Sequence, residues 1–139
     1  MKVLVDTPIW SLALRRGKAL SREEQILVSE LSELINEGQV VLLGPIRQEI
    51  LSGVPTHGQF TALKEKLRAF EDLPLTQADY ERAAEFYNTC RKAGIQGSQI
   101  DFLICSASTG NKIPIFSSDK DFLHYKKHLP VFLYRPRKR

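Results

Sequence analysis

The chain begins with a short apolar run that ends on an acid. The segment Val3–Val5 has no polar alternation, and Asp6 and Thr7 follow it directly. A continuous β-branched run of this kind is typical of a strand buried on both faces in a parallel sheet covered by helices. Asp6 is then expected at the carboxyl end of the strand, where open α/β sheets bind ligands. The alternative is that Asp6 only helps to start the next helix, with Thr7 as N-cap and Pro8 at the first position.

Further along the chain, helical spacing of apolar residues alternates with short apolar runs. Capping boxes at Ser21 and Thr76, and a third possible helix start at Ser98, mark helix beginnings. Helices are predicted over residues 9–16, 21–38, 46–51, 60–70, 76–94, 98–107 and 119–125, the last capped by Ser117 or Ser118. Strands are predicted over residues 3–5, 40–43, 113–116 and 131–134, with 73–75 at best a short edge strand. This alternation indicates an α/β fold with a mainly parallel sheet.

Length and composition limit the classes of protein to which this chain can belong. A chain of 139 residues is the size of one domain, so residues 1–139 are expected to form a single unit. No apolar run is long enough to span a membrane and no signal-peptide pattern is present, which favours a soluble cytoplasmic protein without a membrane partner. Cys90 and Cys105 are predicted to be buried thiols in a reducing compartment.

The positive charge is concentrated near the end of the chain. The formal net charge is +4, yet no acid follows residue 123 and six basic residues do, so the remainder is slightly acidic. These residues are Lys126, Lys127, Arg135, Arg137, Lys138 and Arg139, and the short basic tail covers residues 135–139. Such a cluster suits nucleic acid, and a tail that only keeps the protein soluble explains it equally well.

Several acids occupy positions where a catalytic or metal-binding role is plausible from the sequence. Asp119 follows a predicted strand, as Asp6 does, and Asp121 comes two residues later, as a helix-start acid or an accessory ligand. Asp101 interrupts a helix that is otherwise apolar nearly all round, where an unpaired carboxylate is rare. Its alternative role is the third residue of a capping box with Ser98. Glu49 borders the apolar stripe of its helix and, taken alone, reads as a solvated acid.

Carboxylates that converge on one crevice need a cation. At ~4 Å and an effective dielectric constant of ~20, each like-charged pair costs about 4 kcal/mol. Oxygen ligands without neighbouring His or Cys select Mg²⁺ or Mn²⁺. Such ions activate water and stabilise the transition state of phosphodiester cleavage.

Four segments together resemble the PIN domain family. They are Asp6-Thr7 after an apolar strand, Glu49 within 45–53, Asp101 within 100–107, and Ser117-Ser118-Asp119-Lys120-Asp121-Phe122. With Trp10 and the Arg15-Arg16-Gly17 end of the first helix, the short chain is similar to the VapC ribonuclease toxins of toxin–antitoxin pairs. The resemblance spans nearly the whole chain.

The resemblance implies a three-layer α/β/α sandwich and a Mg²⁺- or Mn²⁺-dependent endoribonuclease that hydrolyses RNA. Asp6, Glu49, Asp101 and Asp119 would form its catalytic site, with Asp6, Asp101, Asp119 and Asp121 around the metal and Glu49 orienting the attacking water. Thr7 and Ser117 would steady these carboxylates, and Arg15, Arg16, Arg137 and Lys138 are candidate RNA-binding residues. A homodimer and an inhibitory antitoxin are the implied partners, with the helices around 27–35 and 60–70 as walls of the antitoxin site. The alternative is a catalytically inert nucleic-acid-binding or adaptor domain of the same fold.

Overall fold

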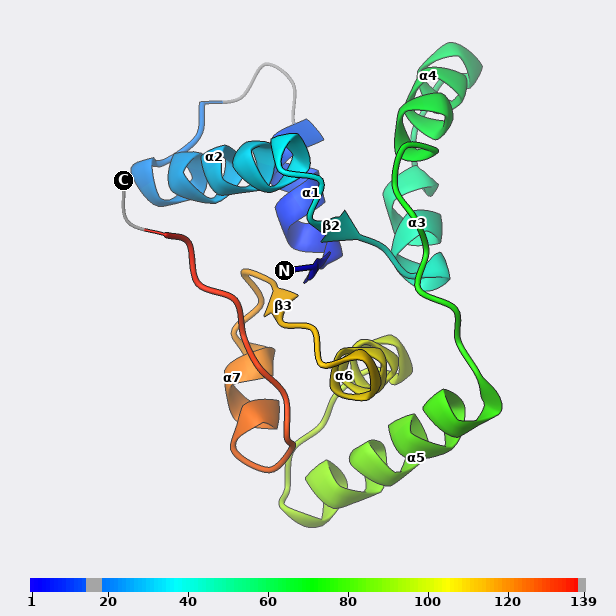
Figure 1. Cartoon of the computed structure of the whole chain (residues 1–139), viewed down its shortest axis with the longest axis vertical. Coiled ribbons are helices and arrows are strands. Elements are labelled where there is room, and N and C mark those ends of the chain that lie inside the picture. Colours follow the sequence, from blue (N-terminus) through cyan, green and yellow to red (C-terminus); the bar gives the residue numbers. More distant parts are fainter. Residues whose placement is uncertain (15–18, 138–139) are drawn as a thin grey trace.

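The structure is a computed structural model that describes residues 1–14 and 19–137 (Figure 1). Its strands are β1 (Val3–Val5), β2 (Val40–Val41) and β3 (Ile115–Phe116). Its helices are α1 (Thr7–Leu14), α2 (Arg22–Asn36), α3 (Gly44–Leu51), α4 (His57–Leu67), α5 (Gln77–Lys92), α6 (Gln99–Asn111) and α7 (Asp121–Lys126). None of the helices in the described part of the chain is both long and apolar enough to cross a bilayer.

The described residues form a parallel sheet of three strands in the order β2-β1-β3. Leu4 of β1 pairs with Val41 on one side and with Ile115 on the other. Helices lie on both sides of this sheet, with α1 and α2 on one side and α5 and α6 on the other (Figure 1). The prediction of a mixed α/β fold with a parallel sheet is therefore confirmed.

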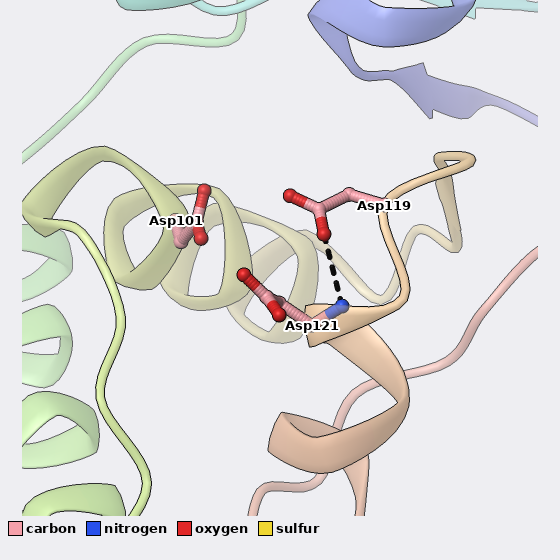
Figure 2. A group of neighbouring side chains, drawn as sticks. All are labelled: Asp101, Asp119 and Asp121. Carbon is pink, nitrogen blue, oxygen red and sulfur yellow. Dashed lines mark hydrogen bonds between the residues drawn. The ribbon is translucent and has the colours of Figure 1, made fainter.

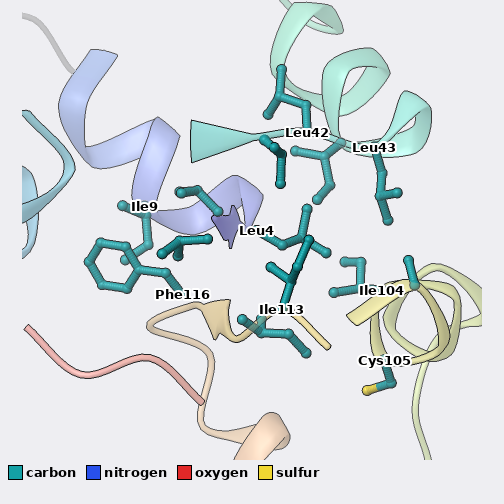
Figure 3. Packing of buried hydrophobic residues seen from close by; sticks show 14 of the residues in the cluster. Leu4, Ile9, Leu42, Leu43, Ile104, Cys105, Ile113 and Phe116 are labelled. Carbon is teal, nitrogen blue, oxygen red and sulfur yellow. The ribbon is translucent and has the colours of Figure 1, made fainter. Parts of the chain in front are cut away.

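The central strand is buried on both faces, as its unbroken apolar run predicts. Val3, Leu4 and Val5 have no exposed surface. Figure 3 shows Leu4 in the core between Ile9 of α1 and Ile104 of α6. Burying apolar side chains on both faces contributes about 1.5–3 kcal/mol for each fully buried residue, so β1 is anchored firmly and its carboxyl end is held in place.

The predicted strands are longer than the strands that the structure contains. Segment 40–43 is a strand only over Val40–Val41, and segment 113–116 only over Ile115–Phe116. Segments 73–75 and 131–134 are not strands. Next to the first of them, Asp72 makes a single parallel bridge to Leu42, and within the second, Leu133 makes a single parallel bridge to Ile115. Prolines at 74, 130 and 136 lack the N–H that a longer ladder would need.

Helix starts agree with the local signals at Ser21 and Thr76, where both bonds of each capping box are present. The last helix is different: α7 begins after Lys120, and neither Ser117 nor Ser118 caps it. The first helix begins at Thr7 rather than at residue 9, and its predicted end at residues 15–16 lies outside the described residues.

Cys90 and Cys105 are free and buried, as predicted.

The carboxyl-terminal segment is attached to α2 through a buried acid. Glu30 is 2% exposed and accepts hydrogen bonds from the hydroxyl of Tyr134 and from Nε of Arg137 at 2.8 Å. The Arg137 guanidinium also donates two hydrogen bonds of 2.9 Å to Glu37. Charge-assisted pairs of this geometry are among the stronger polar contacts, so Tyr134 and Arg137 are held against α2.

Candidate metal site

Parallel pairing of β1 with β3 brings the first and last candidate acids to one edge of the sheet. Val5 pairs with Phe116, and the backbone N–H of Asp6 donates to the carbonyl of Phe116 at 2.9 Å. Asp6 therefore leaves its strand beside Ser117, and Asp119 follows two residues later. Carboxyl ends of adjacent parallel strands meet at one edge, which is why residues 111 positions apart in sequence become neighbours here.

Three aspartates converge at this edge. Asp101 of α6, Asp119 of the loop after β3 and Asp121 at the start of α7 each offer a carboxylate oxygen, and these atoms lie within 4.8 Å of one another. We call these residues the three-aspartate group, and Figure 2 shows their carboxylates directed toward a common space. The backbone N–H of Asp121 donates to Oδ1 of Asp119 at 2.9 Å, which fixes one of the carboxylates.

Asp6 lies beside the three-aspartate group but is not one of its members. Its Oδ1 accepts from the backbone N–H of Thr7 and its Oδ2 from the hydroxyl of Ser117, both at 2.8 Å. The same Ser117 oxygen accepts from the N–H of Asp119 at 3.0 Å. Ser117 thus connects the two acids, and the hydrogen bond expected of it is present.

Burial governs the ionisation of Asp6, which is 5% exposed. Burial raises the pKa of this carboxyl to about 6, against the hydrogen bonds from Ser117 and Thr7, and the charges of Asp101 and Glu49 raise it further. A carboxylate held in such surroundings is unfavourable without a cation nearby. The perturbed pKa therefore favours a functional role over a purely helix-starting role for Asp6.

Glu49 reaches the same edge from α3. Its side chain is exposed, and its Oε1 accepts from the hydroxyl of Thr7 at 3.3 Å. Thr7 therefore contacts both neighbouring acids, through its backbone N–H to Asp6 and through its hydroxyl to Glu49. Glu49 also borders a hollow of about 320 Å³ that Thr7, Gln48 and Ile100 help to line. An exposed carboxylate at this position is able to accept a proton from a water molecule.

Asp101 serves two purposes on α6. Its backbone N–H donates to the Ser98 hydroxyl at 3.0 Å, so Ser98 is the N-cap. Its carboxylate does not form the capping-box bond to the backbone of Ser98, and its Oδ2 accepts from the hydroxyl of Tyr125 at 2.6 Å. Burial raises the pKa of Asp101, as do the charges of Asp119 and Asp121, whereas the Tyr125 and Ser98 hydroxyls lower it. The capping-box reading of Asp101 is therefore only half right.

The donor set of the three-aspartate group fits a hard divalent cation. Its ligands are carboxylate oxygens, with no His or Cys in the group. Oxygen-only sites of this kind suit Mg²⁺ or Mn²⁺ better than Zn²⁺. At an effective dielectric constant of ~20, two charges ~5 Å apart repel by about 3 kcal/mol, and by less where water screens the exposed Asp121. A divalent cation between these oxygens would offset this repulsion.

Sequence reasoning offered Asp121 as a helix-start acid or an accessory metal ligand, and the structure places Asp121 at the start of α7 with its carboxylate beside those of Asp101 and Asp119. It missed one feature of this site. It assigned no role to Tyr125, because an aromatic residue in a short amphipathic helix reads as core. The only local signal is that Asp121 and Tyr125 lie four residues apart and thus share a face of α7.

The structure gives little support to the four candidate RNA-binding residues. Arg15, Arg16 and Lys138 lie outside the described residues. Arg137 directs its guanidinium at Glu30 and Glu37, so the donors that would contact a phosphate already serve these two acids.

A groove of about 560 Å³ runs between α1, α3 and α4 and reaches the site through Glu49. Its apolar lining includes Leu14, Ile50, Val54, Pro55, Ala62 and Leu63. Of the two helices expected to form walls of the antitoxin site, α4 lines this groove together with α1 and α3, whereas α2 packs against α1. That either helix contacts an antitoxin stays a prediction.

One comparison with known proteins identifies the family of this chain. The profile of the family described as PIN domain matches residues 3–128. A comparison with curated protein sequences found no match.

Solved structures add a likeness of fold. The chain is similar to FitAcB from Neisseria gonorrhoeae, with 19% identity, a TM-score of 0.73, and 96% of this chain and 97% of that chain covered. It is also similar to VapBC2 from Rickettsia felis bound to a promoter DNA fragment, with 15% identity, a TM-score of 0.74, and coverages of 96% and 98%. A third likeness is to VapBC-5 from Mycobacterium tuberculosis, of the VapBC family of toxin-antitoxin systems, with 15% identity, a TM-score of 0.67, and coverages of 97% and 99%. At these identities the likeness shows the fold, and the profile match over most of the chain adds the family: this chain belongs to the PIN domain family.

Proposed function

We propose that this protein is a metal-dependent endoribonuclease and the toxin of a type II toxin–antitoxin pair. One observation carries the proposal: carboxylate oxygens of Asp101, Asp119 and Asp121 lie within 4.8 Å of one another at the ligand-binding edge of a parallel sheet. The PIN domain profile and the likeness to toxin–antitoxin structures support it.

The acids of the proposed site have different roles. Asp101, Asp119 and Asp121 would hold Mg²⁺ or Mn²⁺, and Asp6 would add a ligand from its position beside them. When bound, such an ion supplies a water of lowered pKa and stabilises the charge of the phosphoryl transition state. Glu49, exposed and hydrogen-bonded to Thr7, would orient the attacking water and accept its proton. Ser117 and Thr7 keep Asp6 and Glu49 in position through the hydrogen bonds described above.

The groove between α1, α3 and α4 is our candidate for the antitoxin site. It combines an apolar lining with an acid at one edge, Glu49, which is the arrangement that an amphipathic segment carrying an arginine would match. A segment in this groove would reach the acids and cover them. A homodimer in the cytoplasm is part of the same proposal and rests on the family resemblance alone.

The proposal is tested by RNA cleavage with purified protein in EDTA, Mg²⁺ and Mn²⁺. Wild type should cleave only with a divalent cation, and Asp119→Asn should lose at least about 10²-fold in rate while melting as a folded protein. Glu85→Gln, which changes an exposed acid on α5, is the matched control and should cleave normally. Equal cleavage by Asp119→Asn and wild type would contradict the proposed site. A folded wild type that binds RNA but cleaves none with either cation would favour the inert nucleic-acid-binding alternative.

A further inference from the structure

Tyr125 of α7 is buried without exposed surface, and its hydroxyl lies within the candidate metal site. It donates to Oδ2 of Asp101 at 2.6 Å, a short and charge-assisted hydrogen bond. Asp101 belongs to α6, whereas Asp121 starts the same helix as Tyr125. The hydroxyl therefore links α6 to α7, which supply Asp101 and Asp121 of the three-aspartate group.

The surrounding aromatic rings leave Tyr125 little freedom. Its ring centroid lies 5.0 Å from that of Phe102 and 5.3 Å from that of Phe122. Phe102 is in turn held edge-on by Tyr87, at 5.6 Å. Because the ring cannot move without disturbing these contacts, the position of its hydroxyl oxygen is set by the core rather than by solvent.

Gly97 leaves the space that this hydroxyl occupies. A Cβ atom added at Gly97 would lie 2.5 Å from the Tyr125 hydroxyl oxygen and 2.8 Å from the ring of Phe102. The first distance is well below any ordinary contact with a side-chain oxygen, so a larger residue would push the hydroxyl aside. The backbone before α6 is thus shaped around the bond between Tyr125 and Asp101.

We propose that Tyr125 is a positioning residue that holds the Asp101 carboxylate in its metal-binding orientation, with Gly97 providing the room. This inference rests on the proposed function, because it assumes that the three-aspartate group binds a divalent cation. Three neighbouring carboxylates repel one another, and Asp101 would turn away from the others without a restraint. The Tyr125 hydroxyl supplies that restraint, and it keeps the orientation ready before a cation arrives.

The test compares Mn²⁺ binding to Tyr125→Phe, Tyr134→Phe and wild type by isothermal titration calorimetry on folded protein. Tyr125→Phe keeps the ring and removes only the hydroxyl. Tyr134→Phe is the matched control, since its hydroxyl also donates to a buried carboxylate, that of Glu30, away from the three-aspartate group. Losing a group that orients a metal ligand typically weakens binding about 10- to 100-fold. We expect this increase in Kd for Tyr125→Phe and an unchanged Kd for Tyr134→Phe.

Gly97→Ala provides a second variant that keeps every atom of Tyr125 and displaces its hydroxyl. It should weaken Mn²⁺ binding in the same direction as Tyr125→Phe. Wild-type Kd values for both Tyr125→Phe and Gly97→Ala would overturn the inference while leaving the proposed function standing. Equal weakening in Tyr125→Phe and Tyr134→Phe would also overturn it, because that pattern indicates general destabilisation. Absence of Mn²⁺ binding in wild type would overturn the proposed function itself.

Discussion

Asp6 is a buried acid whose surroundings disfavour its charge, so its replacement has a calculable effect on the metal-free protein. Asp6→Asn keeps the size of the side chain and removes the charge. The folded pKa is about 6 and the ordinary value is 3.8, so the folded protein holds a proton more tightly than the unfolded chain. A pKa difference of about 2 corresponds to about 3 kcal/mol.

The folded pKa of Asp6 is the higher of the two, so the charge of Asp6 destabilises the folded protein as the pH rises. Below pH ~4 the carboxyl is protonated in both states, and its ionisation costs the fold nothing. Between pH ~4 and ~6 the unfolded chain loses this proton before the folded protein does, so the free energy of unfolding falls as the pH rises. Above pH ~6 the full penalty remains. Without metal, Asp6→Asn should therefore be more stable than wild type at pH 7.5, and the advantage should vanish near pH 4.

The expected gain is about 1–3 kcal/mol, because the amide reproduces only some of the hydrogen bonds that Ser117 and Thr7 now make. At about 4 °C per kcal/mol for a chain of this size, Tm should rise by about 4–12 °C. Melting followed by circular dichroism in EDTA, from pH 4 to pH 8, measures the effect.

Asp79→Asn is a control of opposite sign. Burial alone would raise the pKa of Asp79, but hydrogen bonds from Thr76 and Arg82 lower it, so this carboxylate stabilises the fold. Asp79→Asn should melt below wild type at pH 7.5. Our reasoning about Asp6 is refuted if Asp6→Asn melts below wild type at pH 7.5, or if any gain is the same at every pH. Adding Mn²⁺ should reverse the order, since wild type gains binding energy that Asp6→Asn loses.

Three further predictions follow from other contacts. Arg47→Ala should lower the free energy of unfolding by about 2–3 kcal/mol in urea denaturation, because Arg47 donates to the backbone carbonyls of Leu67 and Phe70 at the end of α4 and to Asp72; a loss below about 1 kcal/mol would contradict this. Arg137→Gln should lower Tm more than Arg135→Gln, because it removes a charged partner of buried Glu30. Equal Tm values for the two variants would show that the pair of Arg137 with Glu30 does not stabilise the fold. A peptide with the sequence of the antitoxin segment proposed to occupy the groove should bind more weakly as Mn²⁺ rises, and the same peptide with its arginine changed to alanine should lose that dependence. Binding of the native peptide that is indifferent to Mn²⁺ would place the contact away from the acids.

Features with local causes were predictable from the sequence. The buried run of β1 needs only its own composition, and the capping boxes at Ser21 and Thr76 need only neighbours three residues away. Parallel pairing of strands then brings Asp6 and Ser117 together, because an α/β alternation leaves few arrangements of the sheet. This is why several acids of the site could be named before the structure.

Features with distant causes were not predictable. The bond between Tyr125 and Asp101 joins residues 24 positions apart, and the pair of Glu30 with Arg137 joins residues 107 apart. Nothing in the local pattern of either residue signals its partner, because packing of whole elements brings them together. Strand ends were also missed, since apolar residues beside a strand bury equally well without pairing.

The central claim is that the three-aspartate group binds a divalent cation, and anomalous diffraction from a Mn²⁺-soaked crystal tests it most directly. We predict a Mn²⁺ peak at about 2.0–2.3 Å from carboxylate oxygens of Asp101 and Asp119, which the Asp119→Asn protein lacks. A well-ordered wild-type crystal in millimolar Mn²⁺ with no peak at these oxygens, or with the same peak in Asp119→Asn, would contradict the account.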